Sequence, residues 1–285
     1  MIYIQSNNKI PLWDFGSSAL HGCISTGKSY KLREGWEMAG SDATCLVGSV
    51  EWSENWLMTN GFPKPKAIDI LQFEDYLGGD VNVVSVQEFL DSNDEYPIFI
   101  KPYSDIKAFT GTVVKNKFDA ELVLDDYTGD LLTRTAWKNI HSEWRVYVNR
   151  GKVVGCCCYL GNSLIFPDYR VVQDVLKDAL DKLDNISFTL DFATVEFMTL
   201  LIEPNDGWAI GNYGLDPETY LRFCEDRWKQ MITRSVEEIL NFLELKQTEL
   251  EATGEPEEIA FQLAVTYLTK EEVELWHQYN DKNRL

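Results

Sequence analysis

The chain has 285 residues, 45% of them hydrophobic and 25% charged, so it is long enough to form two or three units with buried cores. Its formal net charge of −20 argues against a nucleic acid or an anionic membrane as partner, because both attract clustered Lys and Arg. No stretch approaches the roughly 18 apolar residues of a membrane helix, and the chain starts with a predicted strand rather than an export signal. We therefore expect a cytoplasmic protein.

The amino-terminal section, residues 1–94, is predicted to be a small α/β unit with short strands. Within it, Gly22–Ser29 matches the P-loop pattern, in which four residues separate two glycines and Lys and Ser follow. A P-loop also needs a buried strand directly before it, and residues 13–21 contain no such run. We interpret the segment as a flexible basic loop, from which Lys28 or Arg33 could contact a substrate.

Two lysines open the next section of the chain. Residues 97–100 form a short apolar run that predicts a buried strand, and Lys101 lies where this strand is expected to end. Lys107 follows in a loop, just before the turn Thr110–Gly111. A lysine at the end of a strand is usually only solvated, but two ammonium groups that border one loop are able to face the same cavity.

An arginine lies in the two-stranded ribbon predicted for residues 143–160. Arg145 is on the opposite face of its strand from Trp144 and Val146. One interpretation is a surface ion pair with Glu143, two positions earlier, which contributes little stability if it is exposed. The other is an arginine that points into a cleft and binds a phosphate through two parallel hydrogen bonds.

Carboxylates mark a second predicted hairpin, formed by apolar runs at 190–197 and 200–203. Asp191 and Glu203 each lie beside apolar residues, where a carboxylate without a nearby cation loses free energy through desolvation. The Glu-x-Asn spacing puts Glu203 and Asn205 on one face of a strand, and Asp191 across the hairpin can complete an oxygen set suited to Mg²⁺.

Two features leave the membership of this set open. Pro204 has no amide hydrogen, so the strand is expected to end before it, which leaves the direction of Asn205 undetermined. Asp206 is then an alternative ligand, and Glu196 competes with Asp191. A divalent ion is the simplest partner for whichever of these groups converge.

Helices are predicted at 171–183, from Pro217 to residue 243, and at 256–280, because apolar residues recur there at helical spacing. Asp216 is the predicted N-cap of the second helix, with Pro217 at its first position. We expect the carboxy-terminal helices to pack against the body of the protein, with a homodimer interface as the alternative.

The order of these residues along roughly 95–240 resembles the ATP-grasp superfamily: two lysines, an arginine, an aspartate and a Glu-x-Asn pair. The chain is most similar to the phage and bacterial clade named for one arginine and two lysines. The resemblance implies an α+β fold in which two α/β lobes clamp ATP. It divides the chain into an amino-terminal pre-ATP-grasp unit (1–94), an ATP-grasp domain (95–245) and a helical carboxy-terminal extension (246–285).

The same resemblance implies roles for individual residues. Lys101 would contact the ATP phosphates from a strand, Lys107 would cover them from a flexible loop, and Arg145 would bind the terminal phosphate. Arg145 and Lys107 are the predicted catalytic residues. Adenine would lie near the connection between the lobes. The predicted residues at this connection are Trp137, Lys138 and Ile140, and the predicted Mg²⁺ ligands are Asp191, Glu203 and Asn205.

The resemblance also implies a reaction. We predict an ATP-dependent ligase that activates the carboxylate of a small molecule or peptide as an acyl phosphate and joins it to an amine. The predicted cofactors are ATP and Mg²⁺, and the location is the host cytoplasm if the chain is viral. The alternatives are an ATP-grasp phosphotransferase and a non-catalytic module that binds ATP or another protein.

Overall fold

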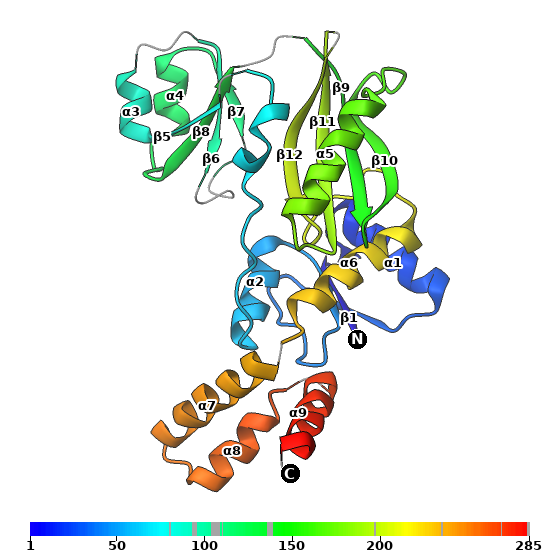
Figure 1. The fold of residues 1–285 in the computed structure, drawn as a ribbon, viewed down its shortest axis with the longest axis vertical. Helices are drawn as coiled ribbons and strands as arrows, with labels where there is room; N and C mark the ends of the chain where they lie inside the picture. Colours follow the sequence, from blue (N-terminus) through cyan, green and yellow to red (C-terminus); the bar gives the residue numbers. More distant parts are fainter. Residues whose placement is uncertain are drawn as a thin grey trace. The chain divides into compact units, whose positions relative to one another are not determined.

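The computed structural model describes residues 1–79, 81–92, 96–103, 109, 111–135, 139–196, 198–234, 236–268 and 270–283 (Figure 1). The chain forms two compact units. The first comprises Met1–Lys66, Asn185–Ser187 and Gly207–Leu285, and the second comprises Ala67–Asp184 and Phe188–Asp206. None of the described helices is long and apolar enough to cross a membrane.

The first unit contains a four-stranded sheet organised around its first strand. Its strands are β1 (Ile2–Asn7), β2 (Ile10–Pro11), β3 (Tyr30–Glu34) and β4 (Cys45–Val47). β1 pairs antiparallel with β2 and parallel with β3 and β4, and it is buried at every position except its last. The strand predicted at the start of the chain is confirmed, and its apolar residues Ile2, Tyr3 and Ile4 are buried in the core.

Three helices belong to the same unit. They are α1 (Trp13–Thr26), α2 (Val50–Thr59) and α6 (Pro217–Met231). α1 packs against α6, and α6 packs against β4. Two buried indoles, Trp56 and Trp228, contact each other between α2 and α6, with ring centroids 5.8 Å apart. Large aromatic side chains therefore supply much of the core that joins the amino-terminal segment to α6.

Helix α1 corrects the interpretation of Gly22–Ser29. A flexible loop was the expected structure, but the helix continues to Thr26 and ends at Gly27, whose φ of +68° is a left-handed cap conformation. Gly22 lies where α1 packs against α6, and a Cβ at this position would overlap the carbonyl oxygen of Pro217. The glycine permits close helix packing, and the residues directly before the motif are helical, whereas a P-loop requires a strand there.

The helix predicted from Pro217 onwards is confirmed at its start and corrected at its end. Asp216 caps α6, and its carboxylate accepts a hydrogen bond from a backbone N–H of the first turn. The helix stops at Met231 and does not continue to residue 243. Arg234 follows the break, and its guanidinium donates hydrogen bonds to the backbone carbonyl oxygens of residues 60 and 61.

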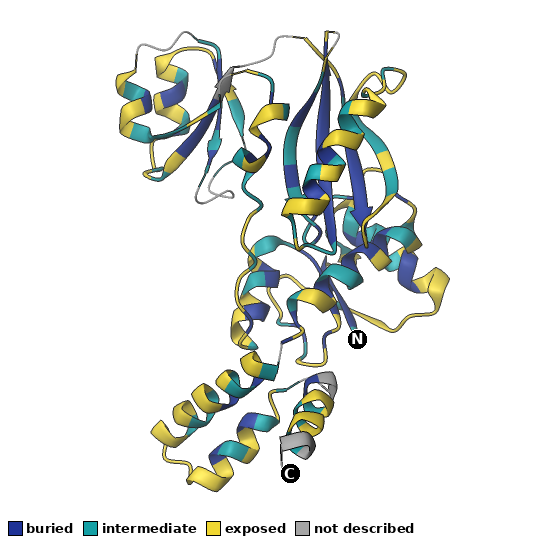
Figure 2. Ribbon diagram, viewed as in Figure 1, coloured by how far each residue is buried: buried dark blue, intermediate teal, exposed yellow. Residues whose placement is uncertain are grey.

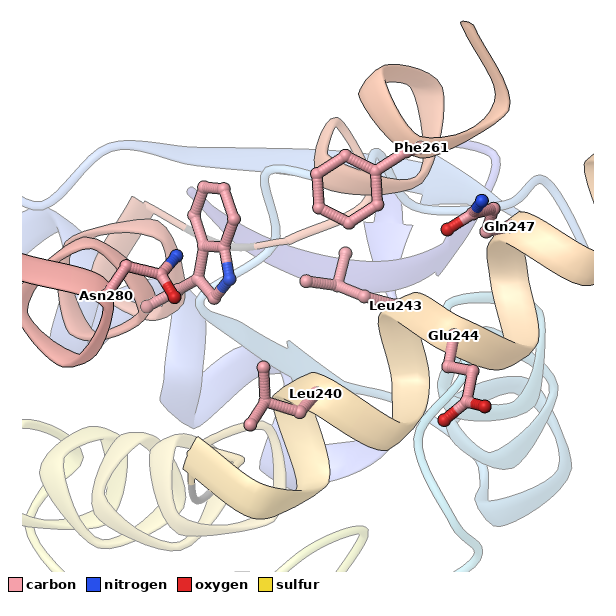
Figure 3. A pocket seen from close by; sticks show the side chains of 7 residues that line it. Leu240, Leu243, Glu244, Gln247, Phe261 and Asn280 are labelled. Carbon is pink, nitrogen blue, oxygen red and sulfur yellow. The ribbon is translucent and has the colours of Figure 1, made fainter. Parts of the chain in front are cut away.

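Three further helices complete the first unit: α7 (Val236–Ala252), α8 (Glu257–Val265) and α9 (Lys270–Asn283). Their shared core is small and centres on Ile239, Leu243 and Ala264. A groove of about 390 Å³ remains between them (Figure 3). Its lining residues are Leu240, Leu243, Glu244, Gln247, Phe261, Trp276 and Asn280.

The second unit contains two four-stranded sheets. The first has the order β5-β8-β6-β7, and all three of its pairings are antiparallel. Its elements are β5 (Val81–Ser85), α3 (Val86–Asp91), β6 (Ile98–Pro102), β7 (Thr112–Val114), α4 (Lys117–Val123) and β8 (Asp130–Thr135). Ser85 forms a capping box with Glu88, which fixes the start of α3 directly after β5.

The second sheet of this unit has the order β10-β9-β11-β12. Its strands are β9 (Ile140–Asn149), β10 (Lys152–Gly161), β11 (Ser187–Val195) and β12 (Met198–Asp206). Helix α5 (Tyr169–Lys182) and the 3₁₀ helix η1 (Ile70–Tyr76) pack against this sheet. Figure 2 shows that β11 is buried along its whole length. Both predicted hairpins and the predicted helix at 171–183 are confirmed, the helix with slightly earlier bounds.

Candidate active site

The second sheet of the second unit has one apolar and one polar face. Phe188, Leu190 and Phe192 of β11 pack into a buried cluster with residues of α5 and η1. Because side chains alternate along a strand, Thr189 and Asp191 point to the opposite face. This alternation explains how a strand that is buried throughout can still carry a carboxylate.

Strand β12 brings the second half of the site to the same face. In the antiparallel pairing of β11 and β12, Asp191 lies opposite Glu203, and Thr189 lies opposite Asn205. Directly opposed residues in such a ladder share a face of the sheet, with Cβ atoms about 5 Å apart. Four oxygen-bearing side chains therefore meet on this polar face.

The expectation that Pro204 ends the strand is wrong. β12 continues to Asp206, and Pro204 pairs with Leu190 inside the ladder. Among the described strands, β12 is at the edge of its sheet, where the lack of a backbone N–H is tolerated. The direction of Asn205 is thus fixed, on the same face as Glu203.

Arg145 of β9 is bonded to Asp191 by two parallel hydrogen bonds. Nε donates to Oδ1 at 2.8 Å, and Nη2 donates to Oδ2 at 2.6 Å. The two side chains are only 6% and 4% exposed, so the interpretation of Arg145 as a surface residue is wrong. Burial raises the pKa of Asp191 to about 6, although the bonds from Arg145 oppose this shift.

Lys101 of β6 connects the first sheet of the unit to this group. Its Nζ donates a hydrogen bond to Glu203 Oε1 at 2.9 Å, across 102 positions of sequence. The strand continues one residue beyond Lys101, so the lysine lies inside β6 rather than at its end. Burial acts to raise the pKa of Glu203, but Lys101 and Asn205 hold it below the usual value.

Asn205 links the two carboxylates. Its Nδ2 lies 3.4 Å from Asp191 Oδ2 and 3.3 Å from Glu203 Oε2. If the amide group of Asn205 turned over, its oxygen and the two carboxylates would form the hard oxygen donor set that Mg²⁺ prefers. Within the described ranges no three Asp, Glu, His or Cys side chains form a metal-binding group, so a metal here would depend on the amide as its third ligand.

The structure separates the alternative ligands from this set. Glu196 is exposed in the turn after β11, with a φ of +53°, and lies beyond the end of the strand that carries Asp191. Asp206 pairs with Phe188 and therefore points to the other face from Asn205.

Several other predicted site residues lie elsewhere. Lys107, Trp137 and Lys138 are outside the described residues. Ile140 is the exposed first residue of β9. In the first unit, Lys28 forms an ion pair with Glu225 of α6.

Sequence reasoning missed two polar-face residues. Tyr159 of β10 lies beside Arg145, with the guanidinium carbon 5.9 Å from its ring centroid. Burial, with Asp191 and Glu143 nearby, raises the pKa of the Tyr159 hydroxyl far above its usual value. Thr189 is fully buried beside Asp191, and its hydroxyl oxygen has no hydrogen-bond partner among the described residues. The i, i+2 spacing of Thr189 and Asp191 was the available signal for the threonine, but the predicted strand began only at residue 190, whereas β11 begins at Ser187.

The sequence match that decides the family covers this whole site. Residues 76–223 match the model of an ATP-grasp domain, family 2 of the clade named for one arginine and two lysines. The chain belongs to this ATP-grasp family. The ATP-grasp fold predicted from the lysines, the arginine and the acidic residues is confirmed.

Solved structures show the same fold at low sequence identity. The ATP-grasp RimK domain protein of Sphaerobacter thermophilus DSM 20745 is 10% identical and matches 79% of this chain and 99% of its own, with a TM-score of 0.53. D-alanine–D-alanine ligase of Bacillus anthracis, solved in complex with ATP, is 11% identical over 80% of this chain and 96% of its own, with a TM-score of 0.52. D-cycloserine synthetase DcsG is 12% identical over 81% and 97%, with a TM-score of 0.50. No curated protein sequence matches the chain.

Proposed function

We propose that this ATP-grasp protein is an ATP-dependent ligase that joins a carboxylate to an amine through an acyl phosphate. The observation that carries the proposal is the convergence of Arg145, Asp191, Glu203 and Asn205 on the polar face of one sheet, with Lys101 reaching them from another. Two of the solved structures with this fold are described as a D-alanine–D-alanine ligase and a D-cycloserine synthetase, which supports this class of reaction.

Each group has a role that its chemistry supports. Asp191, Glu203 and Asn205 would hold Mg²⁺, which would neutralise charge on the triphosphate. Lys101 would exchange its bond to Glu203 for one to a phosphate oxygen once the carboxylate binds the metal. Arg145 would keep Asp191 ionised and oriented while its cationic charge stabilises the phosphoryl group in transit.

The overall reaction follows from these roles. The γ-phosphoryl group moves from ATP to a carboxylate oxygen and ADP leaves. The amine nitrogen then attacks the acyl carbon, phosphate leaves with the C–O bond electrons, and the nitrogen loses a proton. We propose small molecules or peptides as the source of both groups. The cytoplasmic location and the dimer interface remain predictions.

A pooled-substrate assay tests the proposal. The full chain is incubated with ATP, Mg²⁺ and pools of amino acids, peptides and small diacids, and ADP release and product masses are followed. We expect ADP, phosphate and a product lighter by one water than its two substrates combined. A phosphorylated acceptor would instead identify a phosphotransferase, and binding of ATP without turnover would identify a non-catalytic module.

Two matched variants tie the activity to the site. Glu203→Gln removes a ligand charge without changing its shape, and we expect turnover to fall by about 10²- to 10³-fold, the usual range when a key electrostatic group is lost. Glu196→Gln makes the same change in the exposed turn of the same hairpin and should leave turnover intact. Equal activity of both variants would show that the carboxylates lie outside the reaction centre.

A further inference from the structure

Among the described residues of the polar face, Thr189 is the one with a buried side-chain oxygen that lacks a hydrogen-bond partner. It is fully buried, two positions before Asp191 on β11 and opposite Asn205 on β12. Its hydroxyl oxygen has no hydrogen-bond partner in the described part of the chain, whereas the side chains of both these neighbours are bonded. The other buried unpaired side-chain atoms of the described residues belong to the first unit: Arg33 Nε, Ser53 Oγ and Trp228 Nε1.

A hydroxyl in this position destabilises the protein when it stays unpaired, because folding removes it from water without a replacement. Valine has nearly the same shape and would avoid this cost. Threonine is also well suited to a strand, so its presence alone implies nothing. Its position beside two candidate metal ligands, however, makes a bound oxygen atom the natural partner.

The chemistry of the groups around Thr189 indicates which ligand would bond to its hydroxyl. A hydroxyl both donates and accepts, so it can bond to a water molecule that is itself polarised by a cation. Mg²⁺ keeps several of its waters when proteins bind it through few carboxylates, and outer-sphere hydrogen bonds to its ligands affect metal affinity strongly.

We propose that Thr189 is a positioning residue of the metal site, whose hydroxyl bonds to a cation-bound water next to Asp191 and Asn205. This inference rests on the proposed function, since it assumes that a divalent cation binds with the nucleotide. It predicts that the hydroxyl lowers the stability of the metal-free protein and that this loss is recovered when the metal binds.

The test compares two threonines of the same strand in the full chain. Thr194 is also buried, but its hydroxyl lies 2.8 Å from Ser142 Oγ in a hydrogen bond. We expect Thr189→Val to weaken Mn²⁺ binding in the presence of a non-hydrolysable ATP analogue by about 10- to 100-fold. Its metal-free melting temperature should equal or exceed that of the wild type. Thr194→Val should do the reverse, with a lower melting temperature and unchanged Mn²⁺ affinity.

A third variant and the wild type separate the outcomes. Thr189→Ser keeps the hydroxyl and should restore Mn²⁺ affinity, as measured by the electron paramagnetic resonance signal of free Mn²⁺. If Thr189→Val binds Mn²⁺ as the wild type does, or melts lower without metal, the inference is overturned and the proposed function stands. If the wild type itself fails to bind Mn²⁺ with the nucleotide, both are overturned.

Discussion

Two buried arginine–carboxylate pairs lie within the described part of the chain, and they differ in what surrounds them. Arg145 and Asp191 lie in the second unit, and Arg234 and Glu272 lie in the first. Both pairs are almost inaccessible, with side-chain exposures of 6% and 4% in one and 7% and 2% in the other. Burial and charge pairing alone therefore do not distinguish the two arginines.

The surroundings of Arg234 are closed. Its guanidinium bonds to Glu272 and to the backbone carbonyl oxygens of Asn60 and Gly61, at 3.0 and 2.9 Å. Two phenylalanine rings, Phe62 and Phe242, cover it at 3.8 and 4.1 Å. This side chain ties the start of the carboxy-terminal helices to the amino-terminal segment.

The surroundings of Arg145 are more polar, and we call Arg145 and Asp191 the open pair and Arg234 and Glu272 the closed pair. Hydrogen bonds connect the carboxylate of Asp191 through Asn205 to Glu203 and Lys101. The hydroxyl of Thr189, which has no partner among the residues that the structure describes, lies beside Asp191 on β11. Carboxylate, amide and hydroxyl groups therefore surround Arg145, whereas carbonyl oxygens and aromatic rings surround Arg234.

The largest expected effect comes from exchanging each arginine for lysine. Arg145→Lys keeps the charge but cannot donate to both oxygens of Asp191, so we expect ATP turnover to fall by about 10²- to 10³-fold. Arg234→Lys makes the same chemical change in the closed pair and should leave turnover per folded molecule unchanged. Steady-state ADP release measures both, and equal losses would remove the distinction between the pairs.

The second effect concerns stability at the closed pair. Arg234→Met removes the guanidinium charge that pairs with the buried carboxylate of Glu272, so the free energy of unfolding should fall by about 3–5 kcal/mol in urea denaturation. Adding Glu272→Leu removes the buried negative charge and should recover much of this loss. A double variant as unstable as the single one would show that the contacts with the carbonyl oxygens and rings dominate.

The smallest effect is a pH dependence at the open pair. Because burial raises the pKa of Asp191 to about 6, the folded protein holds this proton more tightly than the unfolded chain does. Stabilisation by this group is therefore full at low pH and is lost as pH rises through 6. In EDTA, thermal unfolding at pH 5 and 7.5 should show this loss in the wild type relative to Asp191→Asn. Identical pH profiles would mean that Asp191 is ionised throughout.

The local parts of the site could be predicted because they depend on strand alternation. The period of two in β9, β11 and β12 put Arg145 away from Trp144 and put Glu203 with Asn205, as the structure shows. Lys101 and Glu203 lie on different sheets, so strand periodicity could not bring them together. Only the resemblance to a family with the same order of residues placed both in one site. Proline was misjudged because its cost depends on whether the strand is at an edge, which the sequence does not reveal.

Helix α1 illustrates what local patterns miss. Its residues include two glycines, three serines and a threonine, and few strong helix formers. It is stable because it packs on β1 and α6, with Gly22 at the close contact. Thr189 was missed for the opposite reason: threonine is so ordinary in a strand that only the missing hydrogen bond makes it notable.

Pro204 also affects the exposed edge of the sheet, in addition to the direction of the Asn205 side chain. An open sheet edge presents a row of donors and acceptors to which an extended segment of another molecule can add, which is a common route to aggregation. A proline within β12 interrupts that row, because it contributes no donor. The outer edge of β12 is therefore a poor template for intermolecular β-pairing at this point, which disfavours self-association through this sheet.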